Sequence, residues 1–203
     1  MDATANVVCG PCNSGWMSDL DSQASMTIAN MIRYGSAVSM LPPGIATVAA
    51  FTFKTAVVVD CITTDRPRPF FSHADRKRFA ATLEIPRGVQ VWLSTFHGPR
   101  VHGRFTCHYG QIRGGRFKKF EFYVFTYVAG FLVLQLTAFR WNSVAKRPSF
   151  NPRFIQDTLW DVVSIPLWPP DGKPVTWPSS QYLTRDSVKV LADRWGRISE
   201  IVS

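Results

Sequence analysis

The pattern of apolar residues changes near Pro86, and this change constrains the fold more than any other feature of the 203-residue chain. Before Pro86, apolar side chains recur at helical spacing, as in the run from Trp16 to Ile32 that Gly35 ends. After Pro86, β-branched and aromatic residues form short runs separated by turns that contain glycine. Helices followed by strands predict an α+β fold in which amino-terminal helices pack on an antiparallel sheet.

Three helices are predicted in the amino-terminal part of the chain. Ser14 is the expected cap of the first, which ends at Gly35. A Pro-Pro-Gly sequence introduces the second, over residues 45–61. Its apolar residues lie on almost every side, so we expect it to be the buried central helix. Ser72 is the expected cap of the third, over residues 73–84.

A sheet is predicted over residues 88–139. Its strands are expected at residues 89–96, 101–109, 119–128 and 130–139. The even-numbered residues from 120 to 126 are expected to face one way, because side chains alternate between the two faces of a strand. A tail rich in tryptophan and proline follows, with a short helix near residues 154–163 and a last helix over about 184–195.

Two apolar stretches do not have the character of membrane spans. Lys54 and Asp60 interrupt the first, whereas residues 120–139 are aromatic and β-branched, as in two short strands. The amino terminus lacks the basic start and apolar run of a secretory signal, so we expect a soluble, cytoplasmic protein with no membrane partner. Reduced thiols or metal ligands, and not disulfides, are then expected at Cys9, Cys12, Cys61 and Cys107.

The positive charge is concentrated in the middle of the chain. The formal net charge is +9, and residues 61–160 carry sixteen basic and five acidic side chains. Such a patch suits a phosphate backbone, because neutralising phosphates releases counterions. The alternative is an ordinary solvated surface. The predicted nucleic-acid contacts are Arg76, Lys77, Arg78, Arg100, Arg104, Arg113, Arg116, Lys118 and Lys119.

The segment Cys9-Gly10-Pro11-Cys12 has the chemistry that can be named most directly. A Cys-x-x-Cys turn directs two thiolates at one metal ion, and a following helix steadies their negative charge. A tetrahedral zinc site needs four ligands, and residues 1–8 cannot supply the other pair. Cys9 and Cys12 are therefore predicted metal ligands of an incomplete zinc site. The alternative is a pair of free thiols in a turn.

A longer string around these cysteines resembles a known family. The second zinc knuckle of HNH-endonuclease-like proteins from actinobacteria and their phages has the pattern Val-Cys-x-x-Cys-Asn-x-Gly-Trp-Met. This chain resembles it in Val8-Cys9-Gly10-Pro11-Cys12-Asn13-Ser14-Gly15-Trp16-Met17. Other segments of the family are similar to four further stretches of this chain, at residues 53–60, 86–93, 132–135 and 167–170. The resemblance covers nearly the whole chain, as a half knuckle and helix over residues 1–34 and an α+β domain over residues 35–203.

The resemblance implies a nucleic-acid-associated protein that lacks the family's catalytic half. In such proteins an upstream Cys-x-x-Cys completes a structural zinc site, and an upstream histidine activates water for phosphodiester cleavage. This sequence has neither before Cys9, whereas Asn13 matches the asparagine that helps to arrange the site. The resemblance implies DNA or another nucleic acid as partner, and zinc at the incomplete site. A divalent metal ion is expected only in an active nuclease.

Two other functions fit the sequence. In one, the α+β body binds a protein partner and the amino-terminal cysteines are vestigial. In the other, the chain is a metal-dependent nuclease whose base is one of its own histidines, at positions 73, 97, 102 and 108. Cys107 and His108 are the other adjacent pair of soft ligands. Neighbours on a strand point to opposite faces, which hinders their joining Cys9 and Cys12 at one metal ion.

Overall fold

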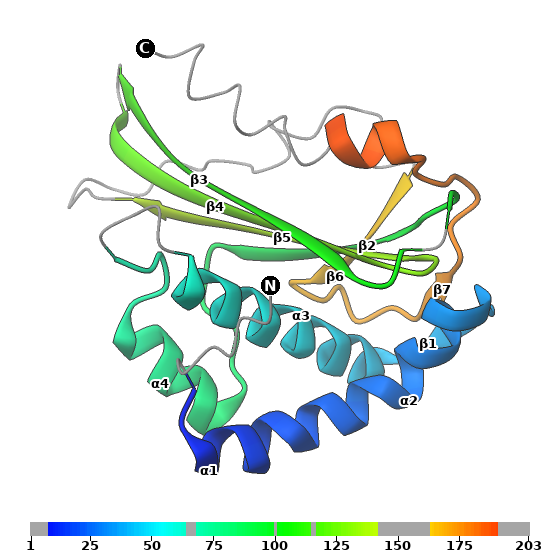
Figure 1. Cartoon of the computed structure of the whole chain (residues 1–203). Coiled ribbons are helices and arrows are strands. Elements are labelled where there is room, and N and C mark those ends of the chain that lie inside the picture. The colour runs from blue at the N-terminus through cyan, green and yellow to red at the C-terminus, as the bar shows by residue number, and fades with distance from the viewer. Residues whose placement is uncertain (1–7, 64–67, 100, 115–116, 142–162, 191–203) are drawn as a thin grey trace.

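The computed structural model contains a helical layer, a five-stranded sheet and a small two-stranded sheet (Figure 1). It describes residues 8–63, 68–99, 101–114, 117–141 and 163–190, with the backbone alone at residues 112–114, 117–120 and 141. The helical elements are α1 (Gly10–Cys12), η1 (Asn13–Met17), α2 (Ser18–Tyr34), α3 (Pro42–Ile62) and α4 (His73–Thr82). The strands are β1 (Val38–Met40), β2 (Val89–Thr95), β3 (Arg104–Gly114), β4 (Phe117–Ala129), β5 (Leu132–Trp141), β6 (Ser164–Trp168) and β7 (Val175–Trp177). The predicted α+β class is confirmed.

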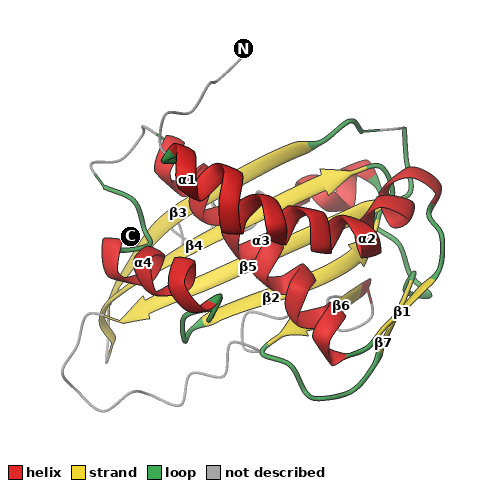
Figure 2. Ribbon diagram, turned by 90° about the horizontal axis from the view of Figure 1, so that it is seen from below, coloured by secondary structure: helices red, strands yellow, loops and turns green. Residues whose placement is uncertain are grey.

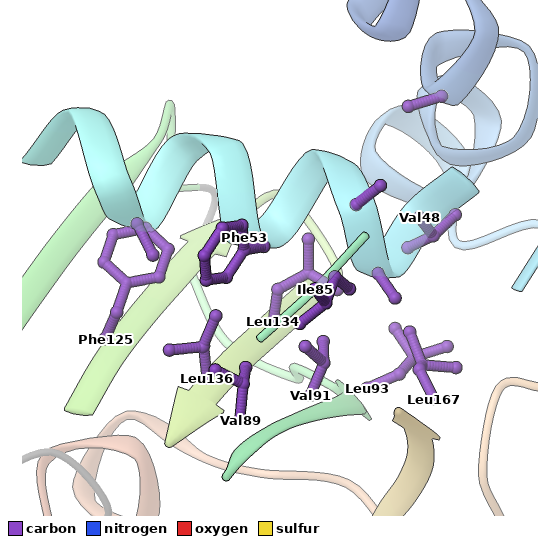
Figure 3. Packing of buried hydrophobic residues seen from close by; sticks show 14 of the residues in the cluster. Val48, Phe53, Ile85, Val89, Val91, Leu93, Phe125, Leu134, Leu136 and Leu167 are labelled. Atoms are coloured by element: carbon purple, nitrogen blue, oxygen red, sulfur yellow. The ribbon is translucent and has the colours of Figure 1, made fainter. Parts of the chain in front are cut away.

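The helices cover one face of the large sheet, and α3 lies across its strands (Figure 2). The strand order is β3-β4-β5-β2-β6, and each neighbouring pair is antiparallel. Phe53 of α3 is fully buried against the sheet, where Leu134 and Leu136 of β5 and Val91 of β2 are also fully or almost fully buried (Figure 3). Residues of α2 belong to the same buried cluster. Apolar burial between this helical layer and the sheet is the main stabilising contribution.

The first helix begins earlier than the sequence predicted. Cys9 is its cap, in an extended conformation, and Ser14 does not act as a cap because its hydroxyl donates to the carbonyl of Gly10 at 2.9 Å. The prediction was wrong because a cysteine thiol occupies the cap position that a serine usually takes. Gly15, with φ −103° and ψ −121°, kinks the chain before α2. As predicted, α2 ends at Gly35, whose φ of +65° suits glycine.

The central helix α3 starts at Pro42, three residues before the predicted start, because proline fits the first turn of a helix. Its length and composition are those of a spanning helix, but 56% of its apolar window is buried inside the protein, as in the core helix of a soluble protein. Both of its charged side chains are buried and partnered. Lys54 pairs with Asp21, and the Asp60 carboxylate accepts hydrogen bonds from two backbone N–H groups.

The predicted cap of α4 is confirmed. The hydroxyl of Ser72 accepts from the Asp75 N–H at 3.1 Å, and the Asp75 carboxylate accepts from the Ser72 N–H at 2.9 Å, which is a capping box. The helix ends at Thr82, two residues short of the prediction, because Leu83 takes a left-handed conformation. Asp60 accepts from the N–H groups of Phe70 and Phe71, which ties the chain before α4 to α3.

The four central strands lie where they were predicted, although β3 ends at Gly114 instead of residue 109, but β1 and the two strands of the tail were missed. β6 joins β2 at the edge of the large sheet, and β7 pairs with β1. Pro166 fits β6 because an edge strand tolerates proline, since one of its sides needs no ladder hydrogen bond. Residues 122, 124 and 126 share one face as predicted, while Tyr123 donates its hydroxyl to Ala56 of α3. The last predicted helix is present over residues 185–190, and residues 154–163 lie outside the described residues.

Candidate functional site

Cys9 and Cys12 lie at the start of the first helix, where the backbone of Cys12 contacts the Cys9 thiol. Cys9 is exposed, and its Sγ accepts a hydrogen bond from the backbone N–H of Cys12 at 3.2 Å. The Cys12 thiol and this N–H both donate to Cys9, which holds the pKa of Cys9 below its ordinary value. The hydrogen bond to Cys9, and then desolvation, raise the pKa of Cys12. The pair therefore has an exposed thiol that ionises first and a half-buried thiol beside it.

The two cysteines line a cavity of about 470 Å³ between the first helix, α3 and α4. We call it the thiol cavity, and its lining is Val8, Cys9, Cys12, Trp16, Met17, Lys54, Val57, Val58, Cys61, His73, Arg76, Lys77, Phe79 and Ala80. The lining includes a third thiol and three fixed cations. None of the described residues that line it is an aspartate or a glutamate.

One buried nitrogen donor near the thiol cavity lacks an acceptor. Nη1 of Arg76 donates to Sγ of Cys61 at 2.8 Å, but Nε of the same guanidinium is buried without a hydrogen-bond partner among the described residues. The buried indole of Trp16 acts instead on the Cys12 thiol, and it partly offsets the rise in the Cys12 pKa that the hydrogen bond to Cys9 causes. The Arg76 Nε is thus an exception to the rule that nearly all buried donors in proteins are satisfied.

Zinc binding at Cys9 and Cys12 stays a prediction. Cys61 and His73 share their cavity, but within the described residues no three His, Cys, Asp or Glu side chains are close enough to hold one metal ion. The Sγ of Cys61 is instead hydrogen-bonded to Arg76. Asn13 is exposed, and its backbone N–H donates to the Cys9 carbonyl at 3.0 Å.

Three of the predicted nucleic-acid contacts lie on α4. Arg76 is half-buried at the thiol cavity, Lys77 is exposed, and Arg78 is exposed and pairs with Glu84 at 2.7 Å. An ion pair of 3.1 Å between Asp75 and Arg140 holds the start of α4 near the end of β5. These residues therefore lie at the end of the sheet where the β3–β4 hairpin turns (Figure 2).

The β3–β4 hairpin holds three more of the predicted contacts. Arg113 is near the end of β3, and Lys118 and Lys119 are near the start of β4, so their backbones lie at the same end of the sheet as α4. Their side chains are not among those that the structure describes. Arg100 and Arg116 fall outside the described residues altogether.

Arg104 lies at the opposite end of β3, where the register pairs it with Val128 near the end of β4. It lines a cavity of about 670 Å³ that we call the basic cavity. The lining is Phe96, Pro99, Val101, His102, Gly103, Arg104, Phe105, Thr106, Thr126, Val128, Arg185, Asp186, Val188 and Lys189. The lining thus includes three cations and one carboxylate. Strand alternation places the exposed ring of Phe105 on the other, helical face of the sheet, where its centroid lies 6.3 Å from that of Phe125.

A second cavity, of about 380 Å³, adjoins the basic cavity, because Val101 and His102 line both. It adds Arg33 and Tyr34 from the end of α2, and the Tyr34 side chain is 69% exposed. Tyr127 also lines it, and burial raises the pKa of that phenol. This end of the sheet therefore brings cations and accessible aromatic rings together.

Arg185 and Lys189 were missed from the sequence. The tail from residue 161 carries equal numbers of basic and acidic side chains, so its net charge gave no signal. The two residues are four apart in the helical segment that begins after Thr184, and this spacing places them on one face. A search for i, i+4 basic pairs would have found them.

The histidines do not gather at one site. His73 lines the thiol cavity and His102 the basic cavity, whereas the His97 ring lies against that of Tyr182 with centroids 5.0 Å apart. Cys107 and His108 are neighbours on β3, and strand alternation places them on opposite faces. Sγ of Cys107 is 3.5 Å from the hydroxyl of Thr63 at the end of α3, on the helical face of the sheet.

The chain was compared with protein-family models, with curated proteins and with solved structures, and none of the three comparisons gave a match.

Proposed function

We propose that the chain is a nucleic-acid-binding protein of the HNH-endonuclease-like class that, in this form, does not cleave its partner. The observation that supports binding best is the gathering of cations at one end of the sheet. Arg104, Arg185 and Lys189 line the basic cavity, Arg33 lines the adjoining one, and Asp186 is the single carboxylate in either described lining. Such an excess attracts a phosphate backbone through counterion release.

The aromatic rings at this end favour a single strand over a duplex. At this end of the sheet Phe105 is 50% exposed on the helical face, and Tyr34 is 69% exposed at the adjoining cavity. A single strand that contacts Arg104 reaches these rings by passing around the edge strand β3. Single-strand binding proteins combine a basic groove with rings on which unpaired bases stack, and each stacked base contributes about 1–3 kcal/mol. A duplex keeps its bases stacked on one another and would use the cations alone.

We propose that cleavage is absent because the two parts that it needs are not assembled. Phosphodiester hydrolysis near neutral pH requires a base, and a metal ion that activates water and stabilises the transition state. Within the described residues the histidines are dispersed, and no cluster of three metal-ligating side chains is present. We also place the protein in the cytoplasm, where its four free thiols would stay reduced.

The test is the salt dependence of binding to a labelled single strand of about 20 nucleotides, which is longer than a typical binding site. Four phosphate contacts predict a slope of log K against log salt near −3, at about −0.7 for each contact. Replacing Arg104, Arg185 and Lys189 together with glutamine should reduce this slope by about 2. Fluorescence anisotropy between roughly 50 and 200 mM salt measures it.

A charge-matched control separates this site from general positive charge. Replacing Lys77, Arg78 and Arg87 with glutamine removes the same charge from exposed positions on and beyond α4. This variant should keep nearly the wild-type slope. Equal losses in the two triple variants would contradict the proposed site. Cleavage of plasmid or single strand by the purified chain with added Mg²⁺ or Zn²⁺ would contradict the inactive assignment.

A further inference from the structure

We propose that Cys9 and Cys12 perform thiol–disulfide exchange with small disulfides that carry carboxylates and bind in the thiol cavity. The proposal concerns the thiols themselves and is independent of nucleic-acid binding. It rests on two features of the described residues, which are the contact between the two cysteines and the composition of the cavity that they line.

The first feature is the pairing of an accessible thiol with a sheltered one. Cys9 is exposed, as the attacking sulfur must be, whereas Cys12 is half-buried beside it. Cys9 and Cys12 are three residues apart in one helical turn, and the Cys12 N–H bonds to the Cys9 sulfur at 3.2 Å, so a disulfide between them closes a short loop within this turn. An exposed attacking thiol next to a resolving thiol is the arrangement that exchange requires.

The second feature is the sign of the charge around these thiols. Arg76 and Lys77 line the cavity, and Lys54 does too, although Asp21 offsets the charge of Lys54. No carboxylate is present among the described lining residues. A carboxylate of the ligand would balance the cations of this lining.

The apolar part of the lining accounts for the remainder of such a ligand. Val57, Val58 and Phe79 form a wall of the cavity, whose volume of about 470 Å³ is in the range of small-molecule sites. This wall can contact the methylene groups next to a disulfide while the carboxylates reach Arg76 and Lys77. The chemistry therefore favours an anionic disulfide over a cationic one.

The exchange balances in two steps. The Cys9 thiolate attacks one sulfur of R–S–S–R, the S–S bond breaks, and RS⁻ leaves and takes a proton from water. Cys12 then loses its proton to water and attacks Sγ of the mixed disulfide, which releases the second RS⁻. The net result is one Cys9–Cys12 disulfide and two RSH. Two electrons pass from the dithiol to the small disulfide, and an added small thiol reverses the reaction.

The experiment exposes the reduced chain to oxidised glutathione, which carries carboxylates, and in parallel to cystamine, which carries ammonium groups. Acid-quenched samples are followed by intact mass and peptide mapping. The expected product is the Cys9–Cys12 disulfide. The rate of the reaction with oxidised glutathione is divided by the rate with cystamine, for the folded chain and for the urea-unfolded chain. This rate ratio should be at least about tenfold higher for the folded chain, because a charged cleft concentrates ligands of opposite sign.

Two variants assign the steps. Cys12→Ser should stop the reaction at a glutathione adduct on Cys9, and Lys77→Gln should lower the rate ratio severalfold while leaving the product unchanged. Cys107, which lies outside the cavity, is the internal reference and should react no faster than in the unfolded chain. Adducts spread equally over Cys9 and Cys107 would overturn the proposal. So would a rate ratio equal to that of the unfolded chain, or purified protein whose Cys9 and Cys12 are blocked by zinc.

Discussion

The thiol cavity and the basic cavity both carry cations, but they hold them differently. In the thiol cavity, Lys54 is buried and paired with Asp21, and Arg76 is half-buried on Cys61. In the basic cavity, Arg104 and Arg185 are exposed, as is Lys189. In the thiol cavity two of the three cations are therefore held by packing, and only Lys77 is exposed, whereas every cation of the basic cavity is a long, exposed side chain that is free to adjust.

This difference indicates what each cavity can select. Cations held by packing lose little freedom on binding, so they can favour one small ligand over another of similar size. Exposed cations contribute attraction that depends on salt and little on the shape of the partner, which suits a polymer of phosphates.

The largest expected effect is on the wall of the thiol cavity. Phe79 is 2% exposed, and its ring lies 4.6 Å from that of Phe53 and 5.7 Å from that of Trp16. Phe79→Ala should lower the free energy of unfolding by about 3–5 kcal/mol, because it leaves a cavity in a packed aromatic cluster. Urea unfolding measures this change. A loss below about 1 kcal/mol would show that this wall is not packed as described.

The next effect concerns the turn that supports the basic end. Gly130 has a φ of +53°, and an added Cβ would lie 1.8 Å from the carbonyl oxygen of Ile32, where α2 ends. Gly130→Ala should therefore cost about 2–4 kcal/mol of stability, from backbone displacement and left-handed strain together. The free energy of unfolding again measures it.

Gly172→Ala is the matched control for this substitution. Gly172 also has a positive φ, of +79°, but an added Cβ there meets nothing within 4 Å. The strain alone should cost about 1 kcal/mol. Equal losses of unfolding free energy at the two positions would mean that the close approach of the β4–β5 turn to α2 adds nothing to the cost of Gly130→Ala.

The sequence predicted the layered fold because its periodic segments were long. The apolar residues around Phe53 lie on every side of α3, and the alternation from residue 120 to 126 fixes one face of β4. The helix cap at Ser72 and the helix end at Gly35 could also be predicted, since each depends on residues that are close in the chain. The edge strand with Pro166 could not, because its pairing depends on a partner about 70 residues away.

The two cavities were less predictable than the fold. Cys9 and Cys12 are neighbours in sequence, so their pairing could be anticipated, but their meeting with Cys61 and Arg76 depends on how α3 and α4 pack. Likewise, no sequence pattern connects Arg104 with Arg185, which is more than 80 residues away. Counting charges along the sequence placed all of the excess positive charge in the middle of the chain. Such a count could not show that α4 and the start of β3 lie at different ends of the sheet.

The third prediction tests stacking at the basic end of the sheet. Phe105→Ala should weaken single-strand binding by about 1–3 kcal/mol, the contribution of one stacked base, and should change stability little because the ring is 50% exposed. Tyr109 is the control, since it lies on the same face of β3 four residues further from the basic end, is 38% exposed and contacts Phe70. Anisotropy titrations at fixed salt compare the two alanine variants. If Tyr109→Ala weakens binding as much as Phe105→Ala, the contact is not confined to the basic end.

The smallest effect concerns the ionisation of Cys9, and it tests whether the thiol pair acts as a unit. The Cys12 thiol donates to Cys9 and so favours the thiolate, which lowers the pKa of Cys9. Cys12→Ala removes this donor but keeps the backbone N–H at 3.2 Å, so the pKa should rise part of the way toward its ordinary value. At a pH below the Cys9 pKa of both the wild type and the variant, the variant has the smaller fraction of Cys9 thiolate. Alkylation of Cys9 by iodoacetamide should therefore be slower in the variant, by less than about tenfold.

Alkylation rates measured across the pH range separate this effect from a change in access to Cys9. A loss of the hydrogen bond moves the midpoint of the rate profile to higher pH and leaves the plateau at high pH unchanged, because every thiol is ionised there. A change of access would scale the rate at every pH. An unaltered midpoint in Cys12→Ala would show that Cys9 ionises independently of its neighbour. The selectivity of the thiol cavity would then rest on Arg76 and Lys77 alone.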